Sequence, residues 1–271
     1  MTTARAEGNR ATVSQVLSRW STSAQPRLAR EVFGVTAVLD EQGSLRRALT
    51  DPAHSDDHRV ALARKVFDGR VSREACDVLE ALMRHRWSGD RGLADALEAA
   101  GVFLTGCAAE NRAGAQGLEH VVDDLLSVQA LLDSDPNVQR AFTDARASDD
   151  AKMRLLGRLG PTMTEEGRLL AEQAVTNPRG ALPQRLLGTF ADHLAALRER
   201  WIARVTTSIE LDRTQQDRLR SALARVYGRD LKIVTDLDRS VVGGLRIAVG
   251  DEVIDGSVAT RLNELQLKLG A

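Results

Sequence analysis

The sequence predicts a mainly α-helical protein with a small α+β part: a duplicated N-terminal helical bundle followed by a small C-terminal α+β domain. Three observations lead to this prediction. Hydrophobic residues make up 43% of the chain but aromatic residues only 3%, so the cores must consist of Leu, Val and Ala, as in packed helices. One stretch of the chain repeats itself at a spacing of 93 residues. From about Trp201 onward, the apolar residues change from helical to alternating spacing.

The repeat aligns residues 35–62 with residues 128–155 and gives twelve identities in 28 positions without a gap. The shared polar residues stand where helices should begin or end, which favours a duplicated helical unit over chance similarity. We therefore expect one helical unit over residues 1–110. A second unit, together with a connecting helix, is expected over residues 111–200.

Polar residues within the repeat predict where helices begin. Ser55 and Ser148 are each followed by two aspartates, so each can cap a helix whose first turn is acidic. Thr162 and Glu165 have the spacing of a capping box. These signals predict several short helices in each copy.

The C-terminal domain is expected over residues 201–271, in the order strand, helix, strand, strand, strand, helix. The expected strands are residues 203–209, 231–236, 245–249 and 253–255. The first helix begins at Thr214, and its expected apolar face consists of Leu219, Ala222, Leu223, Val226 and Tyr227. Ser257 is expected to cap the last helix, and a long helix from about Pro183 to Arg200 connects the domain to the bundle.

Composition and charge argue against several classes of function. The net charge is −1, with 37 basic and 38 acidic residues interspersed, which is not the basic excess of a nucleic-acid binder. The longest apolar stretch, residues 99–109, is about half the roughly 20 residues that a membrane-spanning helix needs. Residues 1–10 do not resemble a secretory signal, and Cys76 and Cys107 are isolated. We therefore expect a reduced, intracellular protein without direct membrane insertion.

Two features in the repeat have more than one interpretation. His54 and His58 are four residues apart, a spacing at which two imidazoles could share a metal. The second copy has alanines at both matching positions and no third ligand is evident, so a solvated helix start is favoured. Whether Trp20, Trp87 and Trp201 lie in the core or at interfaces stays open.

The C-terminal segment also carries residues that catalysis could use. Gly243, Gly244 and Gly250 lack the spacing of a phosphate-binding loop, so turns are favoured. Ser257 as a nucleophile has no elbow motif around it, and a helix cap is favoured. Asp251 and Asp255 could form an acid–base pair, but they bracket a tight turn and are expected to stabilise it. No catalytic residue, cofactor or metal is therefore expected.

One continuous motif in this segment resembles a known family. The run from Asp238 to Leu262, with Gly-Asp-Glu-Val-Ile-Asp-Gly-Ser at residues 250–257, is similar to the C-terminal signature of the delta subunit of F-type ATP synthases. The mitochondrial counterpart is the oligomycin-sensitivity-conferring protein. The signature residues carried over are Gly243, Gly244, Gly250, Asp251, Asp255, Gly256, Ser257 and Arg261. Residues 177–183 resemble the family's link between bundle and C-terminal domain, so the resemblance covers most of residues 110–271.

This resemblance implies a non-catalytic subunit of the stator, or peripheral stalk. It would link the catalytic alpha/beta head to the b-subunit stalk and resist rotor torque during proton-driven ATP synthesis. The implied partners are N-terminal helices of alpha subunits, captured in grooves of the bundle, and the b subunit, held by the C-terminal domain. Contact with the beta and gamma subunits would be indirect, and no nucleic acid is involved. A single copy in a hetero-oligomer, peripheral on the cytoplasmic face of the bacterial cell membrane, is expected.

The chain departs from the usual family pattern by the extra residues of the repeat, which make it an enlarged form. Which copy binds the alpha subunits, and what the extra copy does, is left open by the sequence. Two alternatives remain at this point. The duplicated bundle could belong to a helical adaptor unrelated to the synthase, or the glycine-rich C-terminal turn could belong to an enzyme.

Overall fold

The computed structural model describes residues 12–87, 89, 91–144, 146–200, 202–227, 231–238, 243–249 and 252–255. The chain divides into two compact units, Met1–Leu194 and Ala195–Ala271, and the boundary falls within one helix. The first unit is helical and the second carries the sheet, so the predicted fold class is confirmed. The predicted boundaries at residues 110 and 200 stay predictions.

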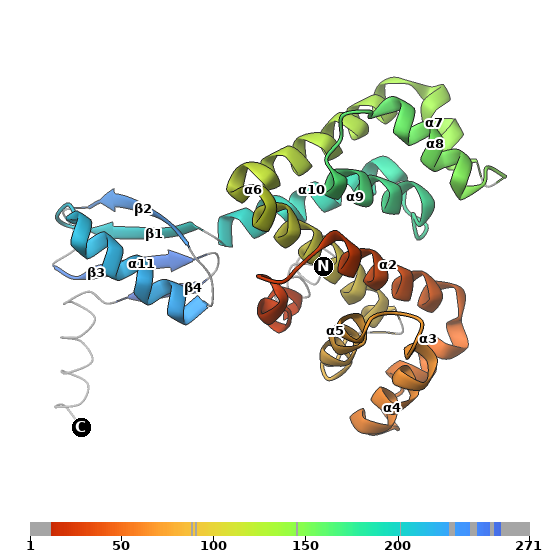
Figure 1. The fold of residues 1–271 in the computed structure, drawn as a ribbon, viewed down its shortest axis with the longest axis horizontal. Coiled ribbons are helices and arrows are strands. Elements are labelled where there is room, and N and C mark those ends of the chain that lie inside the picture. The colour runs from red at the N-terminus through yellow and green to blue at the C-terminus, as the bar shows by residue number, and fades with distance from the viewer. Residues whose placement is uncertain are drawn as a thin grey trace. The chain divides into compact units, whose positions relative to one another are not determined.

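The helices of the first unit fall into two sets that share one long helix, α6 (Figure 1). Before α6 come the short η1 (Ser18–Trp20) and the helices α2 (Pro26–Glu41), α3 (Gly43–Thr50), α4 (Asp56–Phe67) and α5 (Arg73–Met83). The long helix is α6 (Gly92–Ser134). After it come α7 (Pro136–Thr143), α8 (Asp149–Leu159), α9 (Glu165–Thr176) and α10 (Pro183–Arg200).

The two sets match helix for helix at the spacing of the sequence repeat. Helices α3 and α7 have the same length and lie 93 residues apart at both ends. Helices α4 and α8 both begin after a serine whose Oγ accepts a backbone N–H: Ser55 from His58 and Ser148 from Ala151. Both predicted serine caps are therefore confirmed.

Helix α6 belongs to both sets because it bends where the copies join. Ala113 and Gly114 have non-helical backbone angles, and Gly114 lies at a φ of 63°, in the region that favours glycine. The segment before the bend ends the first set, and the segment after it begins the second. By length and composition α6 is long and apolar enough to cross a membrane, which the sequence analysis did not expect. However, 83% of its most apolar window is buried inside the structure.

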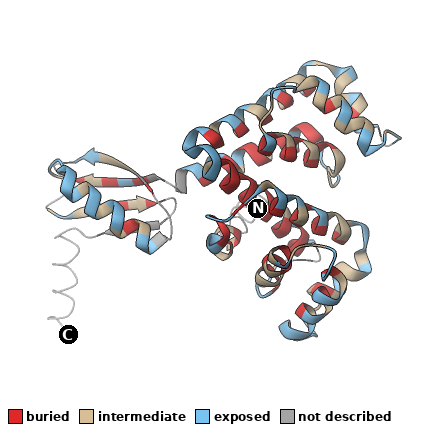
Figure 2. Ribbon diagram, in the orientation of Figure 1, coloured by how far each residue is buried: buried red, intermediate tan, exposed pale blue. Residues whose placement is uncertain are grey.

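The core of the first unit forms where α2 and α9 pack against α6 (Figures 1 and 2). It is built mainly from Leu, Val and Ala, as the composition predicts, and all five phenylalanines of the chain are buried in it. Small residues on α6 bring the helices close together. A Cβ placed on Gly101 would lie 2.4 Å from the ring of Phe33 on α2, so only glycine fits at this crossing.

The second unit is a four-stranded sheet with one described helix. The strands are β1 (Ile202–Thr207), β2 (Lys232–Leu237), β3 (Leu245–Val249) and β4 (Glu252–Asp255), in the order β2-β1-β3-β4. Strand β1 runs parallel to β2 through the crossover helix α11 (Arg213–Tyr227), and β3 pairs antiparallel with both β1 and β4. Ala203, Val205 and Ile247 lie buried on one face of the sheet.

The four predicted strands are present, but several details of the predictions are wrong. Helix α9 is capped by Thr164, not by Thr162, because the Thr164 hydroxyl both accepts from Gly167 N–H and donates to Asp124. Helix α11 begins at Arg213, after a reciprocal pair of hydrogen bonds between Asp212 and Gln215.

Two side chains predicted to be apolar face residues are exposed instead. Ile209 lies beyond the end of β1 and is 67% exposed, and Val226 on α11 is 71% exposed. Leu223, on the same helix, is buried as predicted. The predicted last helix, with its cap Ser257, lies outside the described residues.

The crossing of α2 and α6 gives a test of the packing. Gly101→Ala should lower the free energy of unfolding by about 1–3 kcal/mol, because the added methyl group overlaps the buried ring of Phe33. Gly34→Ala on α2 is the matched control, since a Cβ there meets nothing within 4 Å. That control should raise stability by up to about 1 kcal/mol through helix propensity. Urea unfolding of both variants would measure the difference, and equal effects would contradict the packing argument.

Candidate functional site

The signature glycines stand at the entry to the β3–β4 hairpin of the second unit. Gly243 and Gly244 have φ values of 72° and 87°, so both occupy the left-handed region that other residues avoid. Strand β3 begins at the next residue, and Asp255 pairs with Arg246 at the same end of the hairpin. The structure thus brings three of the predicted residues close together along the backbone. Gly250, Asp251, Gly256, Ser257 and Arg261 lie outside the described residues.

This hairpin leaves apolar side chains at the surface. Strand β4 is an edge strand, and Val253 and Ile254 on it are 50% and 39% exposed. At the end of the parallel pair, Leu237 and Ile209 are also exposed. An edge strand with unpaired backbone groups and exposed apolar side chains is suited to binding another protein.

The two histidines of the first set form a stacked pair at the start of α4. Their ring centroids lie 4.6 Å apart, and Nδ1 of His54 is 3.5 Å from a carboxylate oxygen of Asp51. Among the described residues, no group of three or more His, Cys, Asp or Glu side chains could hold a metal ion.

Of the tryptophans, Trp20 is buried, Trp87 is half-buried and donates its indole N–H to the Leu82 carbonyl, and Trp201 lies outside the described residues.

Arg179, in the loop between α9 and α10, is a buried arginine with three ion-pair partners. Its side chain is 8% exposed and reaches three carboxylates of the first set. Nε of Arg179 lies 2.5 Å from Asp40 on α2, and its two terminal nitrogens lie 2.8 Å from Asp95 and 3.1 Å from Glu98 on α6. One guanidinium of the second set therefore joins two helices of the first.

Burial and charge act in opposite directions on this cluster. Burial raises the pKa of Glu98, and the Arg179 guanidinium only partly opposes that effect. The remaining oxygen of Glu98, Oε1, is buried without a hydrogen-bond partner in the described part of the chain. For Arg179, burial lowers the pKa, but Glu98, Asp40 and Asp95 together raise it above its usual value. The cluster is held by Coulombic attraction against the loss of hydration.

A second polar contact occurs once in each set. In the first set, Glu31 on α2 accepts the backbone N–H of Ser72, the N-cap of α5, at 2.9 Å. In the second set, Asp124 on α6 accepts the backbone N–H of Thr164, the N-cap of α9, also at 2.9 Å. The first helix of each set thus holds the start of the fourth helix through a carboxylate.

The bend of α6 has its own ion pair. Arg112, just before the bend, makes a two-pronged contact with Glu166 on α9, with N–O distances of 3.0 and 3.1 Å. Glu166 is buried, and its carboxylate raises the pKa of Arg112. This pair connects α6 to α9 where the chain passes from the first set to the second.

Sequence reasoning identified the loop of Arg179 as a link but missed the partners of this arginine. Asp40 is 139 residues away and Asp95 is 84 residues away, so no local pattern connects them to Arg179. The structure alone shows that the backbone of Arg179 is also unusual. It adopts a φ of 53°, and a non-glycine residue held in that region commonly has a reason to be there.

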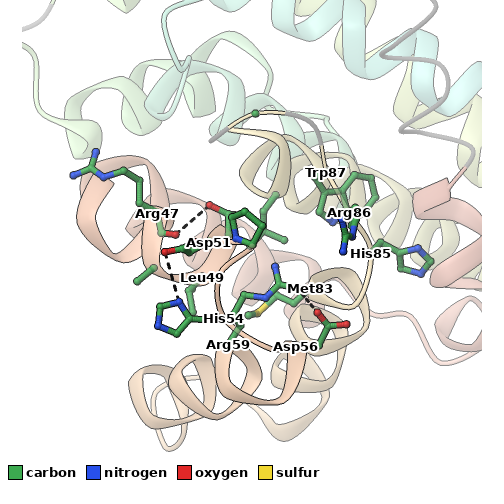
Figure 3. Close-up of a pocket in the computed structure, with 15 residues that line it drawn as sticks. Arg47, Leu49, Asp51, His54, Asp56, Arg59, Met83, His85, Arg86 and Trp87 are labelled. Atoms are coloured by element: carbon green, nitrogen blue, oxygen red, sulfur yellow. Dashed lines mark hydrogen bonds and ion pairs between the residues drawn. The ribbon is translucent and has the colours of Figure 1, made fainter.

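The described residues of the first unit line at least three open grooves. The one between α2 and the α8–α9 pair has a volume of about 470 Å³ and is lined by Phe33, Gly34 and Leu169, among others. A groove of about 860 Å³ lies beside Trp20 and the Arg64–Glu80 ion pair. A third, of about 760 Å³, lies at the end of the first set between α3, α4 and the loop after α5 (Figure 3).

The sequence comparisons agree on one family. Residues 107–269 match the sequence model of the ATP synthase delta (OSCP) subunit family. The delta subunit of ATP synthase from Kocuria rhizophila is 46% identical over 94% of this chain and 94% of its own length. The corresponding subunit of Renibacterium salmoninarum is 41% identical over 96% of this chain and 97% of its own. A chain of the mitochondrial ATP synthase hexamer of Toxoplasma gondii is 23% identical, covering 62% of this chain and 96% of its own, with a TM-score of 0.30.

The Arg179 cluster predicts a large effect of a single substitution. Arg179→Ala should lower the free energy of unfolding by about 3–5 kcal/mol, because it leaves the largely buried Glu98 without its cation, whereas Asp40 keeps Arg91 at 3.7 Å. Adding Glu98→Ala should recover part of that loss. Chemical denaturation of the single and double variants measures the coupling. The exposed Arg185→Ala on α10 is the control and should change stability by no more than about 0.5 kcal/mol.

Glu98 also predicts a pH dependence with a definite sign. Its pKa is raised in the folded state, so folding is favoured by the protonated form and stability is lost as pH rises from the ordinary glutamate pKa through the folded value. Glu98→Gln removes this loss, and its stability relative to the unmodified chain should therefore improve as pH rises.

Glu80→Gln is the opposite case. Hydrogen bonds from Arg84 and Arg64 lower the pKa of Glu80, so its stabilising effect is present above the ordinary glutamate pKa and disappears as pH falls through the folded value. The relative stability of this variant should worsen as pH rises. Unfolding curves from about pH 4 to pH 8 test both variants. Parallel pH profiles for the two would contradict the assignment.

Proposed function

The chain belongs to the ATP synthase delta (OSCP) subunit family, and from this membership we propose how its parts divide a mechanical task. It is a non-catalytic component of the peripheral stalk of an F-type ATP synthase, within the assembly of the alpha/beta head and the stalk. It is thus a peripheral part of a membrane-bound complex. We place it on the cytoplasmic face of the membrane, as a single copy per complex.

The second helical set is proposed to bind the head, through N-terminal helices of alpha subunits. The family match begins at residue 107 and therefore includes α7 to α10 but not α2 to α5. The exposed apolar side chains support the same division. In the part of the chain that the structure describes, the large ones all follow residue 125, and Leu126 on α6 is 46% exposed. An apolar residue on an open helix face is suited to holding an amphipathic partner helix.

The C-terminal unit is proposed to hold the end of the b subunit. Its support is the exposed apolar surface made by Ile209, Leu237, Val253 and Ile254. The signature residues Gly243, Gly244, Gly250, Asp251, Asp255, Gly256, Ser257 and Arg261 are assigned to this stalk-binding domain. Functionally the chain then has three parts: residues 1–110, residues 111–200 and residues 201–271.

A subunit that links the head to the stalk must keep its shape when the rotor exerts torque on the head. In this division the second set and the C-terminal unit each bind one body, and the contacts inside the first unit keep the second set from deforming under load. Ion pairs with one buried member, such as those of Arg179 and of Arg112 with Glu166, resist separation more than fully exposed ones do, because breaking them leaves the buried charge in a dry environment.

A crossed pair of substitutions tests this division. Leu126→Glu should weaken binding to a head preparation lacking this subunit by about tenfold and leave binding to the soluble part of the b subunit unchanged. Leu237→Glu should do the reverse. Calorimetric titration of each variant with the two partners measures both affinities. If either variant weakens both interactions equally, or Leu126→Glu weakens neither, the division is wrong.

A further inference from the structure

The first helical set carries an arginine at the position that Arg179 occupies in the second. Arg179 is the third residue after the end of α9, and Arg86 is the third residue after the end of α5. The two are also 93 residues apart, the spacing of the repeat. Both therefore begin the passage from the fourth helix of a set to its last helix.

The surroundings of the two arginines differ. Arg179 is buried among Asp40, Asp95 and Glu98, which belong to the other set. Arg86 is exposed, and no ion pair joins it to any residue that the structure describes.

Arg86 borders the third groove, of about 760 Å³ (Figure 3). Arg47 on α3 and Arg59 on α4 line the same groove. Asp56 is paired with Arg59, whereas Asp51 accepts the Ala53 N–H and lies near His54. Arg47, like Arg86, has no carboxylate partner within the described ranges. Two unpaired cations thus flank one groove.

The floor of this groove is apolar and rigid. Leu49, Met83 and Leu93 are buried beneath it. Trp87 forms part of its wall, and the hydrogen bond from its indole N–H to the Leu82 carbonyl, at 2.7 Å, fixes the ring. An apolar floor bordered by unpaired arginines and an aromatic ring is typical of the centre of a protein-binding surface.

We propose that this groove is a docking surface for an acidic helical segment of another protein. Carboxylates of that segment would pair with Arg86 and Arg47, as Asp40, Asp95 and Glu98 pair with Arg179. Its apolar side chains would lie against Pro52 and Trp87, which line the groove and are not buried. The extra helical set thereby gives the chain a third binding surface, beyond those proposed for the head and the b subunit.

A second copy of this chain does not fit as the occupant. To bind head to tail, it would have to present the residues of its second set that correspond to Asp40, Asp95 and Glu98. At the repeat spacing these are Asp133, Gly188 and Ala191. Two of the three carboxylates are missing, so the charge complementarity that holds the two sets together is not available between chains.

Photo-cross-linking in the assembled synthase tests this proposal. A benzophenone amino acid replaces Ala53, which is exposed and adjacent to the groove residue Pro52. The complex is purified through a tag on another subunit and irradiated, and the cross-linked peptide is mapped by mass spectrometry. We expect one peptide with at least two Asp or Glu residues at helical spacing.

Charge variants show whether the contact depends on the arginines. Arg86→Glu should lower the cross-link yield by about tenfold, and the yield in the unmodified chain should fall as salt is raised. Arg70→Glu is the matched control: it is an exposed arginine of the same set beyond the far end of α4, and it should leave the yield unchanged. Replacing an acidic residue of the mapped peptide with Lys should restore cross-linking to Arg86→Glu.

Several outcomes would overturn the proposal: no product in a complex that contains the chain, a product with a second copy of the chain, or a product on a peptide without acidic residues. An equal loss of yield in Arg70→Glu would do the same. If Arg86→Glu melts at a lower temperature than the unmodified chain, Arg86→Gln takes its place. The presence of the chain in the purified complex is scored separately, because its absence would count against the stator role instead.

Discussion

The buried guanidinium of Arg179 needs carboxylates to neutralise its charge, and this need determines how the two helical sets are joined. Arg179 can leave water only if carboxylates surround it, and those carboxylates come from α2 and from the first half of α6. The requirement acts on the backbone as well, because Arg179 is held at a positive φ that its side chain does not favour. The loop before α10, the end of α2 and the start of α6 are therefore held together by one buried charge.

The repeat shows which contacts a helical set needs and which it can vary. The contact between the first helix and the cap of the fourth occurs in both sets, although one uses Glu31 with Ser72 and the other Asp124 with Thr164. The aspartate is one methylene shorter, and its partner is also displaced by one position in the alignment, so the backbone adjusts to keep the bond. Exposed residues and the residues that join the two sets are not kept in this way. His54 and His58 are replaced by alanines in the second set, and the carboxylate positions around Arg179 have only one acidic counterpart.

Local features of the fold could be predicted from the sequence, and long-range ones could not. The serine caps, the strands and the equivalence of the two sets follow from patterns that span a few residues or repeat at a fixed spacing. The capping box at Thr162 failed because Thr164 gains a second hydrogen bond from Asp124, which is 40 residues away. For the same reason, no pattern near Arg179 identifies Asp40 or Glu98. Of the candidate site, the positive φ at Gly243 and Gly244 agrees with the favoured turn interpretation, while most signature residues lie outside the described ranges.

Contacts inside the first unit differ in chemistry from the surfaces proposed to bind partners. The internal contacts include ion pairs, whereas the surfaces of the second set and the C-terminal unit are apolar. Inside the first unit, the ion pairs of Arg179 and of Arg112 with Glu166 each include one buried side chain, so opening them leaves a guanidinium or a carboxylate without water or partner. Toward the outside, the second set and the C-terminal unit expose apolar side chains such as Leu126 and Leu237, which lose contact with water when a partner binds. The first set instead exposes arginines around an apolar floor. Such a surface favours a partner of opposite charge over a second copy of the chain, because the second set lacks two of the three carboxylates that hold Arg179.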